Sequence, residues 1–296
     1  MQIDRKQLRG RAPFLGSEAV QDGWLTKAQL RSTALRQLFY DVYVGAAVPD
    51  THLLWIKAAL LRMPPDAVIA GRSAAHVWGV SQVPEAVEII VASHLRANRS
   101  RDGLGPSLDV HRDCLSDEDR SLHRNIRVTT PLRTAWDIGR WLPIRDAVPW
   151  IDALGRVRRL DPIAIGEECR RLQGPGSVRA GEAIAMCDPR AESFPESTLR
   201  VELLLEGLPR LIPQWHVYDG STFVARVDLA WPDVRLAVEY DGIWHASREQ
   251  LVRDRDRLRR LNAAGWRVFP VTAQDMYDIP ALAAELRRVR RTILAH

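Results

Sequence analysis

The sequence predicts a multidomain α+β or α/β protein, and three observations support this class. Two runs, 226–231 and 236–241, alternate apolar and polar residues with the period of two that indicates strands. Helical patterns lie on both sides of these runs, beginning near 193 and near 247. The chain has 296 residues, 46% of them hydrophobic, which is enough for two or three modules with their own cores.

Acidic side chains collect on the two predicted strands, which Pro232-Asp233 separates as a turn. Glu239 and Asp241 are two residues apart, so their side chains point to the same face. If the strands pair, Asp228 joins them there. Crowded carboxylates repel one another unless a cation neutralises them. Oxygen ligands of this kind suit Mg²⁺ or Mn²⁺, so we expect Asp228, Glu239 and Asp241 to be metal ligands.

The last third of the chain resembles the PD-(D/E)XK nuclease superfamily, in particular its Vsr-like branch. The matching pieces, in chain order, are Ser193-Phe-Pro-Glu196, Arg226-Val-Asp228, Glu239-Tyr-Asp241-Gly242 with His245, Asp254-Arg-Asp-Arg257 and Gly265-Trp266-Arg-Val268. The resemblance implies a restriction-endonuclease-like mixed sheet flanked by helices over residues 193–296. It also implies metal-dependent hydrolysis of phosphodiester bonds, with DNA as the expected substrate.

By this resemblance the catalytic candidates are Glu196, Asp228, Glu239, Asp241 and His245. The superfamily's lysine is missing, because Asp241 stands two residues after Glu239 and the three lysines of the chain all lie in its first sixty residues. The Vsr-like branch often lacks this lysine too. His245 is then the candidate that activates water or protonates the leaving oxygen, since an unperturbed histidine titrates at about pH 6.5.

Each candidate also has a purely structural interpretation. Ser193-x-x-Glu196 is a capping box, in which both side chains bond the first amides of a helix. Asp228 and Glu239 can pair with nearby arginines, namely Arg226, Arg235 or Arg267. Asp241-Gly242 can be a turn that ends a strand, and His245 beside Trp244 can be a packed histidine.

A helix capped by Ser247 is expected next, with Leu251, Leu258 and Leu261 as its buried stripe. Asp254 falls inside that stripe and Arg257 lies at its edge. A carboxylate on an inward face needs a partner. The two residues therefore form a structural ion pair, or Arg257 faces a phosphate while Asp254 orients it. Arg253 and Arg260 fall on the solvated face and are candidate contacts to a nucleic-acid backbone.

Residues 1–48 are predicted to form a winged-helix-like unit, with helix candidates at 18–21 and 26–30 and a strand at 38–44. This segment resembles the N-terminal domain of AbiEi-type antitoxins. Those proteins carry a fuller second helix before the strand, and a glycine where this chain has Asp41. A recognition helix confined to 31–37 hardly reaches base edges. The unit is therefore either a DNA reader or a packing and interaction module.

Residues 49–160 are predicted to be a mixed α/β middle domain that also resembles AbiEi-like proteins. Helices are expected at 52–62, 73–79 and from 130, with strands at 87–92, 108–111 and 126–129. Ser73, His76, Arg133 and Asp137 match recurring positions of that family. Arg133 and Asp137 are most simply an ion pair four residues apart on a helix. Residues 161–192 are predicted to be a helical bridge, broken near 173–177.

Charge and cysteine content bear on the kinds of partner and site that the chain can have. The net charge of +5 is compatible with an anionic partner. From Ser193 onward, however, 15 arginines face 14 acidic residues. Cys114, Cys169 and Cys187 form no C-x-x-C pair, which favours neither a zinc site nor a disulfide framework. The first residues lack an apolar signal core and no run of eighteen apolar residues occurs, so we expect a cytoplasmic protein without a membrane partner.

These patterns leave three functional hypotheses open. The first is a DNA endonuclease that depends on Mg²⁺ or Mn²⁺. The second is a non-catalytic DNA-binding, antitoxin-like regulator built on a degenerate nuclease fold. The third is an interaction protein whose partner belongs to a toxin–antitoxin or phage-defence system.

Overall fold

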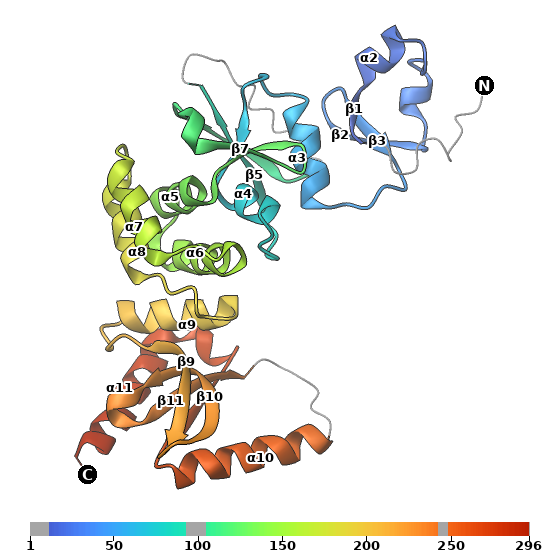
Figure 1. Ribbon diagram of the computed structural model, residues 1–296. Coiled ribbons are helices and arrows are strands. Elements are labelled where there is room, and N and C mark those ends of the chain that lie inside the picture. The colour runs from blue at the N-terminus through green and yellow to red at the C-terminus, as the bar shows by residue number, and fades with distance from the viewer. Residues whose placement is uncertain (1–11, 93–104, 242–247, 296) are drawn as a thin grey trace. The chain divides into compact units, whose positions relative to one another are not determined.

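The protein mixes helices and sheets in two compact units, Met1–Ile138 and Gly139–His296. Figure 1 shows the computed structural model, which describes residues 12–92, 105–241 and 248–295. The strands of these residues form three sheets, one of three, one of five and one of four strands. The multidomain α+β class expected from the sequence is confirmed. No helix among the described residues combines the length and apolar character needed to cross a membrane.

The first unit begins with a small sheet in the order β1-β3-β2, all antiparallel. Its elements are β1 (Phe14–Leu15), α2 (Gly16–Gln21), a 3₁₀ helix (Gln29–Arg31), β2 (Leu35–Phe39) and β3 (Val42–Gly45). The prediction of one continuous strand over 38–44 is wrong, because the chain reverses inside it. Asp41 has a left-handed φ of 61°, a conformation that Asp tolerates better than most residues and that closes the β2–β3 hairpin.

A five-stranded sheet in the order β6-β5-β4-β8-β7 completes this unit. Its elements are α3 (His52–Leu60), β4 (Val68–Ile69), α4 (Gly71–Val77), β5 (Ala86–Val91), β6 (Ser107–Arg112), β7 (Arg120–His123), β8 (Ile126–Thr129) and α5 (Pro131–Trp141), the last of which runs on into the second unit. Every residue of β5 is buried, as expected for a central strand covered on both faces. The predicted strands at β5, β6 and β8 are confirmed. β4 and β7 are short strands that the sequence patterns did not indicate.

Helices open the second unit, and only the second and third of them fall within the helical bridge predicted for 161–192. They are α6 (Ile144–Arg158), α7 (Pro162–Arg171), α8 (Ser177–Met186) and α9 (Phe194–Leu205). The expected break falls between α7 and α8, where Gly176 takes a left-handed φ of 87° against the backbone of Arg140. A side chain at this position would meet the Arg140 carbonyl oxygen at 2.7 Å, so only glycine fits there.

The second unit ends in a mixed sheet in the order β12-β11-β10-β9. It contains β9 (Ile212–Asp219), β10 (Thr222–Trp231), β11 (Leu236–Asp241) and β12 (Arg267–Thr272), with α10 (Arg248–Ala263) and α11 (Ile279–Leu294). β9, β10 and β11 pair antiparallel, whereas β11 and β12 pair parallel. A parallel pair needs a crossover connection, and α10 lies in it.

Helices cover both faces of this sheet (Figure 1). Leu229 and Val238 pack with α9 and α11, through residues such as Leu203 and Leu286. Ala230 and Ala237, which face the opposite way, pack with Leu261 of α10. The buried stripe predicted for α10 is only partly correct, because Leu258 is 39% exposed. The Leu258 side chain lines a cavity instead of packing in the core.

Candidate active site

Asp228 and Glu239 lie opposite one another on neighbouring strands. β10 and β11 pair Leu229 with Val238 and Ala230 with Ala237, so Asp228 and Glu239 occupy the next position of the same register. Both side chains therefore share the face of Ala230 and Ala237, which is the face that α10 covers. The strand pairing thus brings together the two carboxylates that stand eleven positions apart in the sequence.

An open cavity of about 590 Å³ lies beside Asp228 and Glu239. Its lining residues come from β10, β11, α10 and β12: Asp228, Glu239, Tyr240, Asp241, Asp254, Arg257, Leu258, Val268 and Pro270. The three residues predicted as metal ligands all line it. Asp241 is the last residue of β11 and is exposed.

The environment of Asp228 shifts the pKa of its carboxyl group. Burial, together with the neighbouring carboxylates of Glu196 and Glu239, raises the pKa of its side chain to about 6. A hydrogen bond from the Tyr240 backbone N–H to Oδ2, at 3.2 Å, and the charge of Arg257 act in the opposite direction. Burial and the like charges outweigh these two contributions, so additional positive charge beside this carboxylate would be favourable.

Glu239 has an arginine partner, but not one of those predicted. Arg257 of α10 donates from Nη1 to Oε2 of Glu239 at 2.9 Å, and its Nη2 bonds Oε1 of Glu239. Nη2 also donates to the carbonyl oxygen of Arg226 at 2.8 Å. Arg226 itself pairs with Glu192, at 2.9 Å. The guanidinium of Arg257 is therefore directed at Glu239, while Asp254 lines the same cavity.

Glu196 is buried at the start of α9, where the predicted cap forms. Ser193 Oγ accepts the Glu196 backbone N–H at 3.3 Å and donates to Glu196 Oε1 at 2.8 Å. Glu196 Oε2 accepts from the Glu192 backbone N–H and from Gln214 Nε2, both at 2.9 Å. The Ser193 half of the predicted capping box is confirmed, whereas the Glu196 carboxylate accepts the Glu192 N–H, one residue before the N-cap. Glu196 is also close enough to Asp228 to raise the pKa of that residue.

Gln214 is a residue of this neighbourhood that the sequence analysis missed. It belongs to β9, has a left-handed φ of 54°, and stands in register with Asp228, between the pairs Val227–Trp215 and Leu229–Pro213. Its amide holds Glu196 in place. No local pattern marks a glutamine of this kind, because its role follows only from strand pairing.

The remaining predicted site residues are placed less centrally. Arg253 and Arg260 are exposed on α10 and do not line the cavity. His245 lies outside the described residues. Within the described ranges, no three His, Cys, Asp or Glu side chains already converge closely enough to hold a metal ion.

The candidate residues of the middle domain, Ser73 and His76, contact other side chains and the backbone of the same domain. Ser73 is fully buried, and its Oγ lies 2.9 Å from His52 Nε2, donates to the Ala86 carbonyl oxygen and accepts the Glu88 N–H. Burial, with help from the charges of His76 and Arg72, lowers the pKa of His52 to about 4. His76 Nδ1 lies 2.9 Å from the carbonyl oxygen of Gln82.

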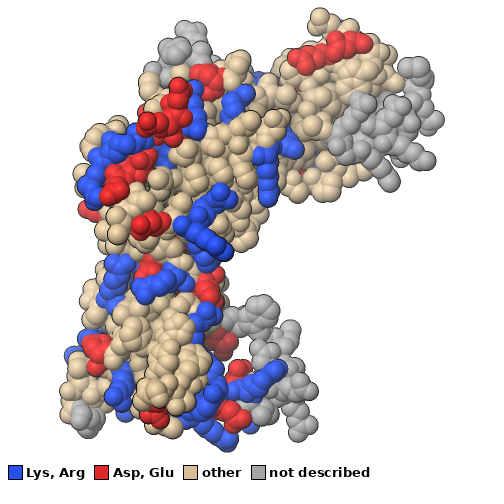
Figure 2. All heavy atoms as spheres, in the orientation of Figure 1, with Lys and Arg blue, Asp and Glu red and all other residues tan. Residues whose placement is uncertain are grey.

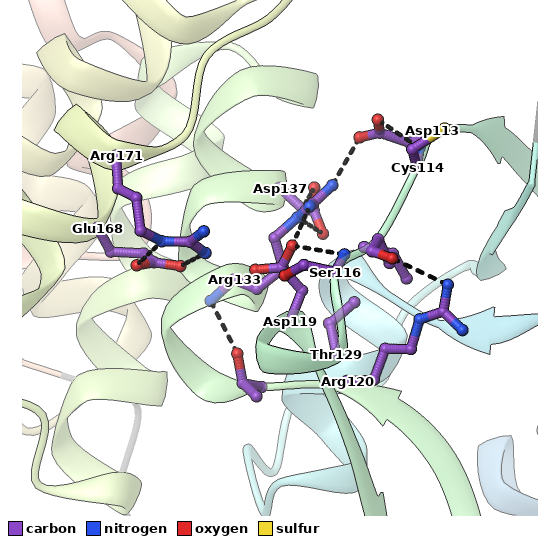
Figure 3. Close-up of polar contacts among 12 residues, drawn as sticks. Asp113, Cys114, Ser116, Asp119, Arg120, Thr129, Arg133, Asp137, Glu168 and Arg171 are labelled. Carbon is purple, nitrogen blue, oxygen red and sulfur yellow. Dashed lines mark hydrogen bonds and ion pairs between the residues drawn. The ribbon is translucent and has the colours of Figure 1, made fainter.

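Arg133 is the centre of a larger network than the predicted ion pair (Figure 3). Its Nε bonds Asp137 at 3.1 Å, its Nη1 bonds Asp119 at 3.1 Å and its Nη2 bonds Asp113 at 2.6 Å. The Arg133 side chain is 2% exposed. The predicted Arg133–Asp137 pair is confirmed, and two further carboxylates from the loop before β7 complete it.

The fold and the cavity define a multidomain α+β protein with a carboxylate-lined cavity in its second unit. No family model matches the chain. The chain is 33% identical over 264 residues to two Mycobacterium tuberculosis proteins, the uncharacterized protein MT2308 of strain CDC 1551 / Oshkosh and the uncharacterized protein Rv2248 of strain ATCC 25618 / H37Rv. Each alignment covers 88% of this chain and 94% of the relative. The chain belongs to the same family as these two proteins.

Among solved structures, the crystal structure of the RV2827C protein from Mycobacterium tuberculosis matches with a TM-score of 0.44 and 16% sequence identity. The match covers 73% of this chain and 87% of that one.

Proposed function

We propose that residues 193–296 form a Vsr-like PD-(D/E)XK nuclease domain that hydrolyses phosphodiester bonds in DNA with the help of a divalent metal. One observation carries the proposal: Asp228 and Glu239, from adjacent strands, line a single cavity with Asp241. The mixed sheet with helices on both faces supports the restriction-endonuclease-like fold that the resemblance implies.

The residues of the cavity fit Mg²⁺ or Mn²⁺ in their chemistry. All three candidate ligands offer carboxylate oxygens, the donors that these hard cations prefer. Burial, and after it the neighbouring carboxylates of Glu196 and Glu239, raise the pKa of Asp228, and a cation beside it would offset both effects. Asp228 and Glu239 would hold the metal, with Asp241 as a further ligand. A metal bound there would polarise a phosphoryl oxygen and lower the pKa of a bound water.

The chain's own residues supply the rest of the proposed chemistry. Arg257 points its guanidinium toward the carboxylates, and this planar fork also matches the geometry of a phosphate. Glu196, held by Ser193 and Gln214, keeps negative charge next to Asp228. His245 remains the proposed group that activates water or protonates the leaving oxygen. Arg253 and Arg260, exposed on α10, are proposed contacts to the DNA backbone.

The charge distribution favours local rather than broad contacts with DNA. Basic and acidic side chains are interspersed over the face that Figure 2 shows, and no large area of one sign stands out. Phosphate contacts to Lys and Arg dominate the affinity of most DNA-binding proteins. We therefore expect weak non-specific binding by the nuclease domain, with the arginines of α10 as its main contributors.

The first unit is proposed to choose the substrate or the partner. Its start is the proposed winged-helix-like element and the remainder the proposed AbiEi-like core. Only a 3₁₀ helix, Gln29–Arg31, stands where a recognition helix would begin. This favours recognition of a protein, such as a component of a toxin–antitoxin or phage-defence system, over the reading of base edges.

A second candidate is a non-catalytic DNA-binding regulator on a degenerate nuclease fold. The ion pair between Arg257 and Glu239 favours it, because a carboxylate already neutralised by a guanidinium has less need of a metal. The regulator hypothesis predicts that the protein retards DNA of its own promoter in gel electrophoresis, in a sequence-specific and metal-independent way.

Cleavage of supercoiled plasmid and of single-stranded DNA, with Mg²⁺ and then Mn²⁺, tests the proposal. The variants are Asp228→Ala and Glu239→Ala. Asp256→Ala is the matched control, since Asp256 is an exposed acid of α10 that pairs with Arg259. We expect metal-dependent nicking by the wild type and the control, and none by the two site variants, which should still bind DNA. Nicking that survives both site variants, or no nicking by the wild type with either metal, contradicts the proposal.

A further inference from the structure

The guanidinium of Arg257 engages both carboxylate oxygens of Glu239, which a metal at this position would also use. Nη1 meets Oε2 at 2.9 Å and Nη2 meets Oε1. The bond from Nη2 to the Arg226 carbonyl oxygen, at 2.8 Å, anchors the same group to β10. Asp228 has a different partner, the backbone N–H of Tyr240. The two carboxylates that face one another across the strands are therefore neutralised to very different degrees.

A guanidinium and a divalent cation cannot both sit close to Glu239 without strong like-charge repulsion. If Asp228 and Glu239 held a metal, Arg257 would therefore have to leave at least one oxygen of Glu239. The Arg257 side chain is 29% exposed and lines the cavity, so it has room to turn aside. A displaced guanidinium then needs a new anionic partner, and a phosphate matches its fork.

We infer that Arg257 competes with the divalent metal for Glu239, so that metal binding releases the guanidinium to hold a phosphate of the DNA. This inference rests on the proposed nuclease function and adds a regulatory step to it. Without metal, Arg257 neutralises Glu239 and also bonds the backbone of β10. With metal, the same side chain becomes a phosphate contact. Metal and DNA then promote each other's binding, since coupling between two ligands is reciprocal.

Calorimetric titration of the full-length chain with Mn²⁺, without DNA and at fixed pH and ionic strength, tests the competition. Arg257→Gln removes the competing charge, and we expect it to bind Mn²⁺ about tenfold more tightly than the wild type, within the usual range of coupling between sites. Arg257→Lys keeps a charge without the fork, so its affinity should fall between the two. Arg259→Gln is the matched control, because Arg259 lies on the same helix, is 80% exposed and pairs with Asp256. Its affinity should equal that of the wild type.

Fluorescence anisotropy measures whether the released Arg257 contacts a phosphate. The quantity measured is the affinity of the protein for a phosphorothioate duplex, which resists cleavage. Mn²⁺ should raise the affinity of the wild type for this duplex by about tenfold, and should raise that of Arg257→Gln far less. Circular dichroism confirms that each variant is folded. Equal increases for the wild type and Arg257→Gln overturn the role of Arg257 as the released phosphate contact.

Glu239→Gln separates failure of the inference from failure of the proposed function. If the wild type binds Mn²⁺, Glu239→Gln does not, and Arg257→Gln binds no more tightly than the wild type, the competition is overturned while the metal site stands. If neither the wild type nor Arg257→Gln binds Mn²⁺, the metal site is overturned and the inference with it. Binding by Arg257→Gln that is tighter than that of the wild type supports both.

Discussion

Arg200 of α9 and Asp152 of α6 form an ion pair in which neither side chain is exposed, with 2.6 Å between Nη2 and Oδ2. Nη1 of Arg200 donates to the carbonyl oxygen of Met186 at 2.6 Å, and Oδ1 of Asp152 accepts the Asp188 N–H at 2.7 Å. The pair therefore joins α6, the end of α8 and the first helix of the proposed nuclease domain. The domain boundary was predicted between residues 192 and 193. This ion pair crosses it, because Asp152 precedes the boundary and Arg200 follows it.

Removing one partner of this pair should be costly. Asp152→Ala leaves a buried guanidinium without a counter-charge, and we expect a loss of about 3–5 kcal/mol in the free energy of unfolding. Urea denaturation followed by circular dichroism measures it. The double variant Asp152→Leu/Arg200→Met, which removes both charges at similar volume, should lose much less. A double variant as unstable as the single one would show that packing, not charge compensation, governs this position.

Arg133→Lys should destabilise the first unit although it preserves the charge. The three guanidinium nitrogens of Arg133 serve three different carboxylates, those of Asp113, Asp119 and Asp137. A single ammonium cannot reproduce this geometry. Losing one or two charged hydrogen bonds should cost about 2–3 kcal/mol by urea denaturation. The control is Arg36→Lys at a more exposed pair with Asp50, where we expect almost no change. Equal effects of the two substitutions would contradict the prediction.

Asp228→Asn should stabilise the metal-free protein. Folding raises the pKa of Asp228 from 3.8 to about 6, so the folded state binds this proton more tightly than the unfolded chain. Stability from this group is therefore greatest at low pH and is lost as the pH rises through 6. At pH 7.5 the neutral amide should gain about 1–2 kcal/mol, less than the full shift implies because the carboxyl retains some solvent contact.

The measurement for Asp228→Asn is thermal and urea denaturation in the presence of a chelator. The advantage of the variant should shrink as the pH is lowered from 7.5 to 5. A variant that is less stable than the wild type at pH 7.5 would mean that Asp228 is well compensated in the folded protein. The Asp228 carboxylate would then have no unfavourable charge for a metal in this cavity to neutralise.

His52 should make the first unit sensitive to mild acid. Its pKa falls from 6.5 in the unfolded chain to about 4 in the folded protein, chiefly because of burial. The neutral ring therefore contributes stability that is present above about pH 6.5 and is lost as the pH falls toward 4. Between pH 7 and pH 5 the loss should be about 2 kcal/mol. His52→Gln, which cannot titrate, should lose less stability over this interval, and identical losses in urea denaturation would exclude His52 as the cause.

Much of the second unit follows from local patterns. The alternation at 226–231 and 236–241 matches β10 and β11, and Ser193 caps α9 as its spacing with Glu196 predicts. The single strand expected at 38–44 was wrong, because alternation alone does not reveal that Asp41 adopts a left-handed turn. The buried position expected of Leu258 was wrong because the face it occupies borders a cavity.

The sequence by itself determined where β10, β11 and the Ser193 cap lie and which faces the acidic side chains of these two strands take, because these features depend on neighbours a few residues away. Only the tertiary structure decided which charged side chains form ion pairs with one another. Glu239 pairs with Arg257, 18 residues along the chain, and Arg200 with Asp152, 48 residues back. Such pairs depend on how helices dock against a sheet or against one another. That docking is governed by the packing of whole apolar faces, which no local spacing encodes.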